Sequence, residues 1–130
     1  MIVDSSVLVA ILLGEPETAR FGRALLRNPD GKLPSSCLLE ASMIALSRRG
    51  EAGILDLDIL VMRLGLELLP FTPSQARIAR EAFRRYGKGR HAAGLNFGDC
   101  MAYAAARELG EELLFKGTDF GLTDVAVAKY

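Results

Sequence analysis

The chain has 130 residues, of which half are hydrophobic and a quarter are charged. This balance is typical of a globular domain with its own core, and it excludes a disordered chain. Sixteen basic and sixteen acidic residues cancel, so a nucleic-acid partner would have to bind a local patch rather than the overall charge.

Residues 7–13 form the longest aliphatic run, which is far too short to span a bilayer. No basic start with a cleavage site precedes it, so we expect neither a signal peptide nor a membrane anchor. Cys37 and Cys100 have no metal-ligand spacing and lie inside apolar helical patterns. We therefore expect two buried, reduced thiols in a cytoplasmic protein.

The chain begins with a short apolar segment that ends in a carboxylate. Residues 2–3 (Ile-Val) are β-branched and predict a buried strand, and Asp4 follows directly. Ser5 and Ser6 offer N-cap oxygens for an apolar helix over residues 6–14. A carboxylate at this position is costly without a partner. In open α/β sheets, the same position is where ligands bind.

The next elements are a surface helix over residues 17–27, a strand over residues 32–34 and a helix over residues 37–48 that ends at Gly50. Glu40 is the only acidic residue of the last helix, and its sequence neighbours are apolar. A first-turn position near a helix N-terminus is electrostatically favourable for an acid. A solvated helix-start carboxylate is the alternative to a site residue.

A further helix over residues 52–65 carries more aliphatic side chains than one core-facing stripe can absorb. We expect part of it, with part of residues 7–13, to be covered by a second subunit or a partner protein. Burial in the protein's own core is the alternative. A strand over residues 67–71 and a helix over residues 73–86 follow.

Residues 84–91 (RRYGKGRH) combine five potentially cationic side chains with an aromatic ring and two glycines, and they contain no acid. Flexible backbone and cations suit a polyanion, so we predict a phosphate-binding loop here, which would contact RNA if the partner is a nucleic acid. The predicted RNA-binding residues are Arg85, Lys88, Arg90 and His91. Plain solvated surface is the alternative.

The last third of the chain repeats the opening pattern. Asn96 is the predicted N-cap of a helix that ends near Gly110, which places Asp99 at the third helical position. A plain capping role is the alternative for Asp99. Residues 113–115 predict a strand, and Asp119 follows it.

Residues 125–128 predict an edge strand. Because strands alternate with helices throughout, we expect a parallel sheet covered on both faces. The predicted fold is α/β, a three-layer α/β/α domain with a central parallel sheet of four to five short strands. We expect residues 1–130 to form one domain, because no linker or repeat interrupts them.

Four acids share a position at a strand end or in the first turn of a helix, beside apolar sequence. They are Asp4, Glu40, Asp99 and Asp119. In a parallel sheet these positions lie along one edge, where the carboxylates would repel one another unless a divalent cation joined them. All-oxygen ligation indicates Mg²⁺, with Mn²⁺ as a substitute, and phosphodiester hydrolysis as the chemistry. Ser6 and Thr118 can add hydroxyl contacts.

Four stretches resemble PIN-domain ribonucleases, specifically VapC-type toxins of type II toxin–antitoxin systems. They are residues 1–8 (MIVDSSVL), 36–42 (SCLLEAS), 86–100 (YGKGRHAAGLNFGDC) and 114–124 (LFKGTDFGLTD). The resemblance spans essentially the whole chain and implies a single PIN domain. It also implies a Mg²⁺-dependent endoribonuclease in which Asp4 and Asp99 bind the metal while Glu40 and Asp119 complete the site. The family often has proline where this chain has Ala92.

The same resemblance implies a homodimer that a cognate VapB-type antitoxin neutralises, and it leaves open that the complex binds DNA through the antitoxin. Two other functions remain. A Mg²⁺-dependent phosphatase of the haloacid-dehalogenase kind also begins with a strand ending in Asp, but it usually needs a second acid where Ser6 stands. A non-catalytic, metal-dependent RNA-binding regulator is the third reading.

Overall fold

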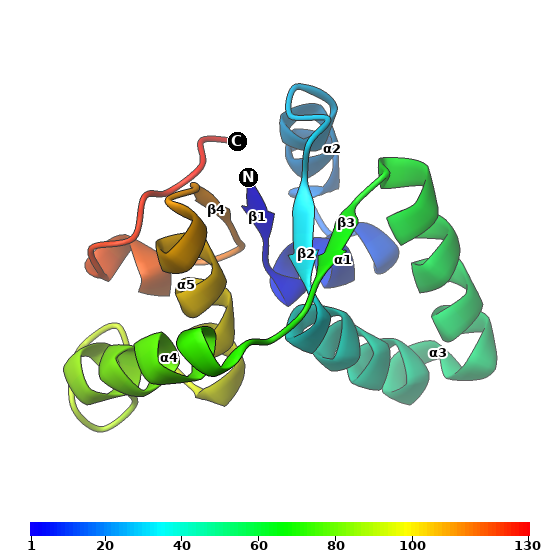
Figure 1. The fold of residues 1–130 in the computed structure, drawn as a ribbon. Coiled ribbons are helices and arrows are strands. Elements are labelled where there is room, and N and C mark those ends of the chain that lie inside the picture. Colours follow the sequence, from blue (N-terminus) through cyan, green and yellow to red (C-terminus); the bar gives the residue numbers. More distant parts are fainter.

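The computed structural model describes residues 1–130 and contains a four-stranded parallel sheet between two layers of helices (Figure 1). The strands are β1 (Ile2–Val3), β2 (Lys32–Pro34), β3 (Glu67–Leu69) and β4 (Leu113–Leu114). They lie in the order β3-β2-β1-β4, and every pair is parallel. The chain therefore changes direction across the sheet between β1 and β4, which is the place where such sheets bind ligands.

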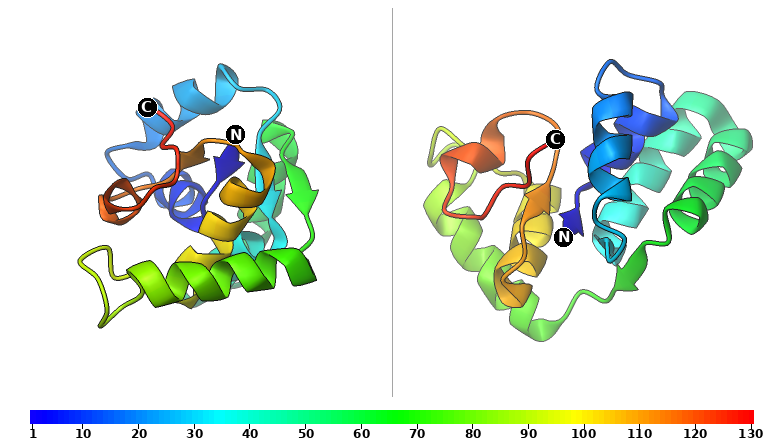
Figure 2. Two further views of the ribbon diagram at one scale, coloured as in Figure 1. Left: turned by 60° about the vertical axis from the view of Figure 1, so that its left-hand side comes forward. Right: turned by 90° about the horizontal axis from the view of Figure 1, so that it is seen from above.

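The helices divide between the two faces of the sheet. One layer holds α1 (Ser5–Leu12), α2 (Thr18–Leu26) and α3 (Ser35–Leu64), and the other holds α4 (Pro73–Tyr86) and α5 (Phe97–Leu109). Figure 2 shows the layers from above, with α4 and α5 on one side of the sheet. The predicted three-layer α/β/α architecture with four parallel strands is confirmed.

Helix α3 bends sharply at Gly50, where φ is 64° and ψ is −154°. This left-handed φ carries a steric cost for residues with a Cβ, and glycine avoids it. The two helices predicted on either side of Gly50 are thus the two halves of α3, joined without a loop.

Strand β4 ends one residue earlier than predicted, and two other predicted strands differ more. Strand β3 ends at Leu69 rather than at residue 71, because Pro70 has no N–H to continue the ladder. Residues 125–128 do not form a strand but contribute one isolated parallel bridge, between Leu113 and Val127. The pairing is short because β4 itself has only two residues, and Leu113 alone exchanges backbone hydrogen bonds with this segment, at Ala126 and Ala128.

The starts of two predicted helices also differ. Asp4, rather than Ser5 or Ser6, is the N-cap of α1, since its side chain accepts a hydrogen bond from the Ser6 backbone N–H. Helix α3 begins at Ser35, two residues earlier than predicted, and no side chain caps it.

The buried apolar side chains form one connected core around β1. Cys37 and Cys100 are both buried and free, as predicted. None of the helices combines the length and the apolar content that crossing a membrane requires.

Candidate active site

A cavity of about 300 Å³ at the carboxyl edge of the sheet brings the four predicted acids together. Each acid comes from a different element: the end of β1, the first half of α3, the first turn of α5, and the 3-10 helix η1 (Asp119–Leu122). In that order they are Asp4, Glu40, Asp99 and Asp119. Segments separated by most of the chain therefore meet at one wall, as the strand-end positions predict.

Asp4 is the most buried of the four carboxylates, with 4% of the residue exposed. The backbone N–H and the hydroxyl of Ser6 donate to its Oδ2 at 3.0 and 2.5 Å, and no ion pair includes it. Burial raises the pKa of Asp4 to about 6; the Ser6 hydrogen bonds oppose this, and the charges of Asp99 and Glu40 add to it.

Glu40 is held by a hydroxyl and a glycine. The Ser5 Oγ donates to its Oε2 at 2.6 Å. Gly98 lies so close that a Cβ there would stand 2.8 Å from both carboxylate oxygens. Because α3 begins at Ser35, Glu40 lies in its second turn, and the predicted first-turn position is wrong. Its place in the cavity depends on the contacts with α1 and α5 rather than on the α3 N-terminus.

Asp99 both caps its helix and lines the cavity. Its Oδ2 accepts from the Asn96 N–H at 2.8 Å, and its own N–H donates to the Asn96 Oδ1 at 2.9 Å, which completes a capping box. Burial raises the pKa of Asp99, the Asn96 hydrogen bond lowers it, and the charges of Glu40 and Asp119 raise it further. The capping role and the cavity role thus coexist in one side chain.

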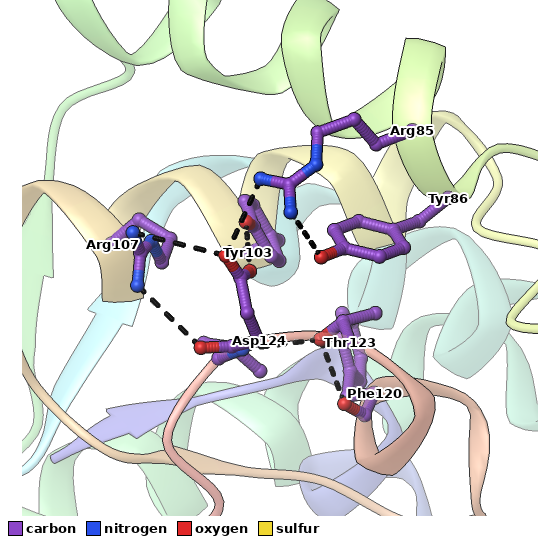
Figure 3. Close-up of polar contacts among 8 residues, drawn as sticks. Arg85, Tyr86, Tyr103, Arg107, Phe120, Thr123 and Asp124 are labelled. Atoms are coloured by element: carbon purple, nitrogen blue, oxygen red, sulfur yellow. Dashed lines mark hydrogen bonds and ion pairs between the residues drawn. The ribbon is translucent and has the colours of Figure 1, made fainter.

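Asp119 is exposed at the start of η1, and the chain after η1 is anchored at Asp124 (Figure 3). The Tyr103 hydroxyl donates to Asp124 Oδ1 at 2.5 Å, and Arg85 pairs with Oδ2 at 3.3 Å. Arg107 lies 4.0 Å from the same oxygen. Two helices of the α4–α5 layer therefore hold the segment that carries Asp119.

Ser6 lines the cavity, whereas the other predicted supporting and RNA-binding residues do not. Those residues are Thr118, Arg85, Lys88, Arg90 and His91. Arg85 is paired with Asp124, the Arg90 guanidinium lies over the Phe83 ring at 5.6 Å, and the His91 ring contacts Tyr86 edge-on. The loop after α4 projects beyond the end of the helix layer (Figure 2). RNA contacts there stay a prediction, separate from the cavity.

Three polar residues of the cavity were not singled out from the sequence as site residues: Ser5, Glu15 and Lys116. Lys116 follows the predicted strand over residues 113–115 directly, so the rule that selected Asp4 could have found it. Ser5 was interpreted as a cap, and only the structure shows that its hydroxyl reaches Glu40.

The donor set at the cavity consists of carboxylate and hydroxyl oxygens, which suit a hard cation such as Mg²⁺ or Mn²⁺. No three His, Cys, Asp or Glu side chains form a group that could hold a metal ion by themselves. Mg²⁺ usually binds one or two carboxylates and keeps several waters. The residues therefore fit a hydrated ion better than a closed protein cage.

An apolar hollow of about 510 Å³ adjoins the acidic cavity and shares Glu40 with it. Leu39, Met43 and Phe97 line this hollow and are 63%, 62% and 82% exposed. In the second half of α3, where we predicted a covered surface, Leu55 and Met62 are exposed while Leu57 is buried. Exposed apolar side chains thus occur in the predicted region and, in addition, beside the acids.

The family model and two similar relatives point to the same protein family. Residues 1–126 match the family model described as the PIN domain. The chain is similar to "Ribonuclease VapC" of Mycolicibacterium smegmatis, at 46% identity over 126 residues that cover 97% of this chain and 98% of the relative. It is also similar to "Ribonuclease VapC30" of Mycobacterium tuberculosis, at 43% identity with 97% and 96% covered.

Two solved structures share the fold at low identity. Mycobacterium tuberculosis VapC20, a Sarcin-Ricin loop cleaving toxin, superposes with a TM-score of 0.79 at 17% identity, covering 96% of this chain and 95% of that one. The structure of VapBC2 from Rickettsia felis bound to a DNA fragment from their promoter gives a TM-score of 0.76 at 15% identity, covering 99% and 97%.

Proposed function

This chain belongs to the PIN-domain family, among its VapC ribonucleases, and we propose that it hydrolyses RNA at the acidic cavity with a divalent cation, as the toxin of a VapBC pair. The observation that carries the site is the convergence of four carboxylates from four elements on one cavity. We also propose that residues 1–130 act as a single PIN domain.

In this proposal Asp4 and Asp99 bind the cation, and Glu40 and Asp119 complete the site. A Mg²⁺ or Mn²⁺ ion held by these residues would supply a water of lowered pKa and positive charge for the leaving oxygen. The protein fixes the carboxylates through neighbours that donate hydrogen bonds: Ser6 to Asp4, Ser5 to Glu40, and the Asn96 backbone to Asp99. Glu40 Oε1 accepts no such hydrogen bond and is free to accept a proton from water.

The electrostatics support a cation-dependent site. The buried Asp4 carboxylate has a raised pKa and other carboxylates as neighbours, an arrangement that a cation relieves. Ser6 stands where the phosphatase alternative usually has an acid, and its hydroxyl is bonded to Asp4. The absence of an acid at position 6 favours the nuclease over the phosphatase.

We propose a homodimer and a VapB-type antitoxin as protein partners, and a cytoplasmic location. The exposed apolar side chains beside the cavity, on α3 and α5, support a protein partner at this surface. The Rickettsia felis structure contains VapBC2 with promoter DNA. By analogy, DNA binding by the complex would run through the antitoxin.

The test is cleavage of single-stranded and structured RNA by purified protein with Mg²⁺, with EDTA, and as Asp4→Asn. Asp58→Asn is the matched control, because Asp58 is exposed and unpaired on α3. We expect EDTA and Asp4→Asn to lower the rate by about a thousandfold, in line with the loss of a main electrostatic group at a catalytic site, and Asp58→Asn to have no effect. Cleavage that is indifferent to both treatments would refute the proposal. RNA retention without cleavage would indicate the non-catalytic regulator.

A further inference from the structure

Lys116 is the only basic residue that lines the acidic cavity. We propose that Lys116 binds a phosphate of the RNA there, and that Glu15 and Glu17 hold its ammonium at the cavity wall until the phosphate arrives. This inference rests on the proposed function, which it extends by naming the group that receives the substrate.

A wall of carboxylates repels a polyanion. Besides the four acids of the site, Glu15 also lines the cavity, so one divalent cation leaves the wall with excess negative charge. A phosphate that approaches this wall needs a further positive group. Lys116 is placed to supply it.

The backbone of Lys116 is tied to the acids. Its N–H donates to the Ser6 Oγ at 2.9 Å, and the same hydroxyl donates to Asp4 Oδ2 at 2.5 Å. The Lys116 Cα therefore has a fixed position relative to Asp4, and the reach of its side chain is set from that point. A phosphate that binds Lys116 would consequently lie at a defined position relative to the Asp4 carboxylate.

The ammonium is paired with two glutamates at the edge of the cavity. Nζ lies 2.5 Å from Glu15 Oε2 and 3.3 Å from Glu17 Oε2. The Glu17 oxygen is buried and receives no hydrogen bond in this arrangement. The Lys116 side chain is 34% exposed, so solvent and a ligand can reach its ammonium. An ammonium has three donors, so a phosphate can join or replace Glu15.

The test measures binding of a fluorophore-labelled RNA oligonucleotide of mixed sequence, by anisotropy, in the Asp4→Asn background with Mg²⁺ present. Adding Lys116→Met should weaken binding about tenfold and reduce the slope of log Kd against log salt by about one. Lys116→Arg should restore most of the affinity. Lys129→Met is the matched control, because Lys129 is exposed and outside the cavity, and it should bind as the background does.

Glu15→Gln tests the holding role, because it removes one counter-ion of Lys116; binding should tighten by about two- to fivefold. Equal affinity and equal salt slope for Lys116→Met and Lys129→Met would overturn the inference. Binding by wild-type protein without cleavage would overturn the proposed function alone. Circular dichroism of Lys116→Met and Lys116→Arg identifies any loss of affinity due to unfolding.

Discussion

The protein places carboxylates in two contrasting clusters that the η1 segment connects. In the acidic cavity, Asp4 is buried with hydroxyl and amide donors and with other carboxylates as neighbours. In the Asp124 cluster (Arg85, Tyr103, Arg107 and Asp124), a carboxylate meets a phenol and two guanidinium groups (Figure 3). One cluster is short of positive charge, and in the other two guanidinium groups more than offset the single carboxylate.

The pKa values move in opposite directions in these two clusters. Burial raises the pKa of Asp4 to about 6, whereas the Tyr103 hydrogen bond and the two arginines lower the pKa of Asp124. A raised carboxyl pKa means that the charged form opposes folding, and a lowered one means that it stabilises the fold. The comparison teaches that Asp124 contributes stability, while Asp4 retains an unfavourable charge that a ligand can relieve.

The largest difference between the clusters should appear when Mg²⁺ is added. At a hundredfold excess over its Kd, a ligand that binds only the folded state adds about 2.7 kcal/mol to the free energy of unfolding. Wild-type protein and Asp124→Asn should both gain this stability at pH 7.5, and Asp4→Asn should not. Thermal melts with Mg²⁺ and with EDTA measure it. An equal gain in Asp4→Asn would place the ion elsewhere.

The next effect is the stability of the metal-free protein. Asp4→Asn should raise the free energy of unfolding at pH 7.5 by about 2 kcal/mol, because a shift of about two pKa units at 1.36 kcal/mol each is partly offset by a weaker bond from Ser6. Asn also keeps the N-cap of α1. Urea unfolding in EDTA measures the change, with Asp58→Asn as the control. If Asp4→Asn were less stable than wild type, the charged Asp4 carboxylate would not oppose folding as we infer.

The pH dependence of stability tests independently whether ionised Asp4 opposes folding. The folded protein binds a proton at Asp4 more tightly than the unfolded chain does. The stability that protonated Asp4 contributes is therefore fully present below pH 3.8 and is lost as the pH rises through about 6. The advantage of Asp4→Asn should therefore fall to about 1 kcal/mol at pH 5 and vanish near pH 4. An advantage that is the same at pH 5 and pH 7.5 would exclude the raised pKa as its cause.

The Asp124 cluster should respond in the opposite way. Asp124→Asn should lower the free energy of unfolding by about 1.5 kcal/mol, since it removes charge-assisted bonds that are more than a third exposed. Because the pKa of Asp124 is lowered, its contribution is present above pH 3.8 and is lost as the pH falls further. Urea unfolding at pH 7.5 tests the loss, and Tyr103→Phe should lose part of it. If neither variant changes the free energy of unfolding, the Asp124 cluster does not anchor the chain after η1.

The acidic cavity could be predicted from the sequence because the pattern that identifies its acids is local: a short buried strand is followed by an acid. Asp4 and Asp119 follow such strands, and a parallel sheet brings strand ends to one edge. The same rule, applied to the basic residue after β4, would have included Lys116. Glu40 was selected for its apolar neighbours, and its predicted first-turn place was wrong.

The Asp124 cluster could not be predicted in this way, because it depends on contacts between α4, α5 and the chain after η1. No local pattern relates Arg85 to Asp124, which are 39 positions apart. Exposed apolar side chains beside the acids were missed for a similar reason, since Leu39 and Phe97 come from two helices that meet only in the folded protein.

The smallest expected change in stability comes from Gly98→Ala, which alters the cavity without altering its charges. A Cβ at position 98 would lie 2.8 Å from both oxygens of Glu40, so the carboxylate must move and its bond to Ser5 must lengthen. The gain in helix propensity, at most about 1 kcal/mol, offsets this loss, and the free energy of unfolding should stay within about 0.5 kcal/mol of wild type.

RNA cleavage by Gly98→Ala should nevertheless fall about tenfold, because small displacements of catalytic groups are costly. Gly22→Ala is the matched control, since Gly22 lies inside α2 and a Cβ there meets no atom within 4 Å. It should gain stability and cleave normally. If Gly98→Ala also cleaves normally, cleavage does not require the position of the Glu40 carboxylate. The reaction would then depend on Asp4, Asp99 and Asp119 without Glu40.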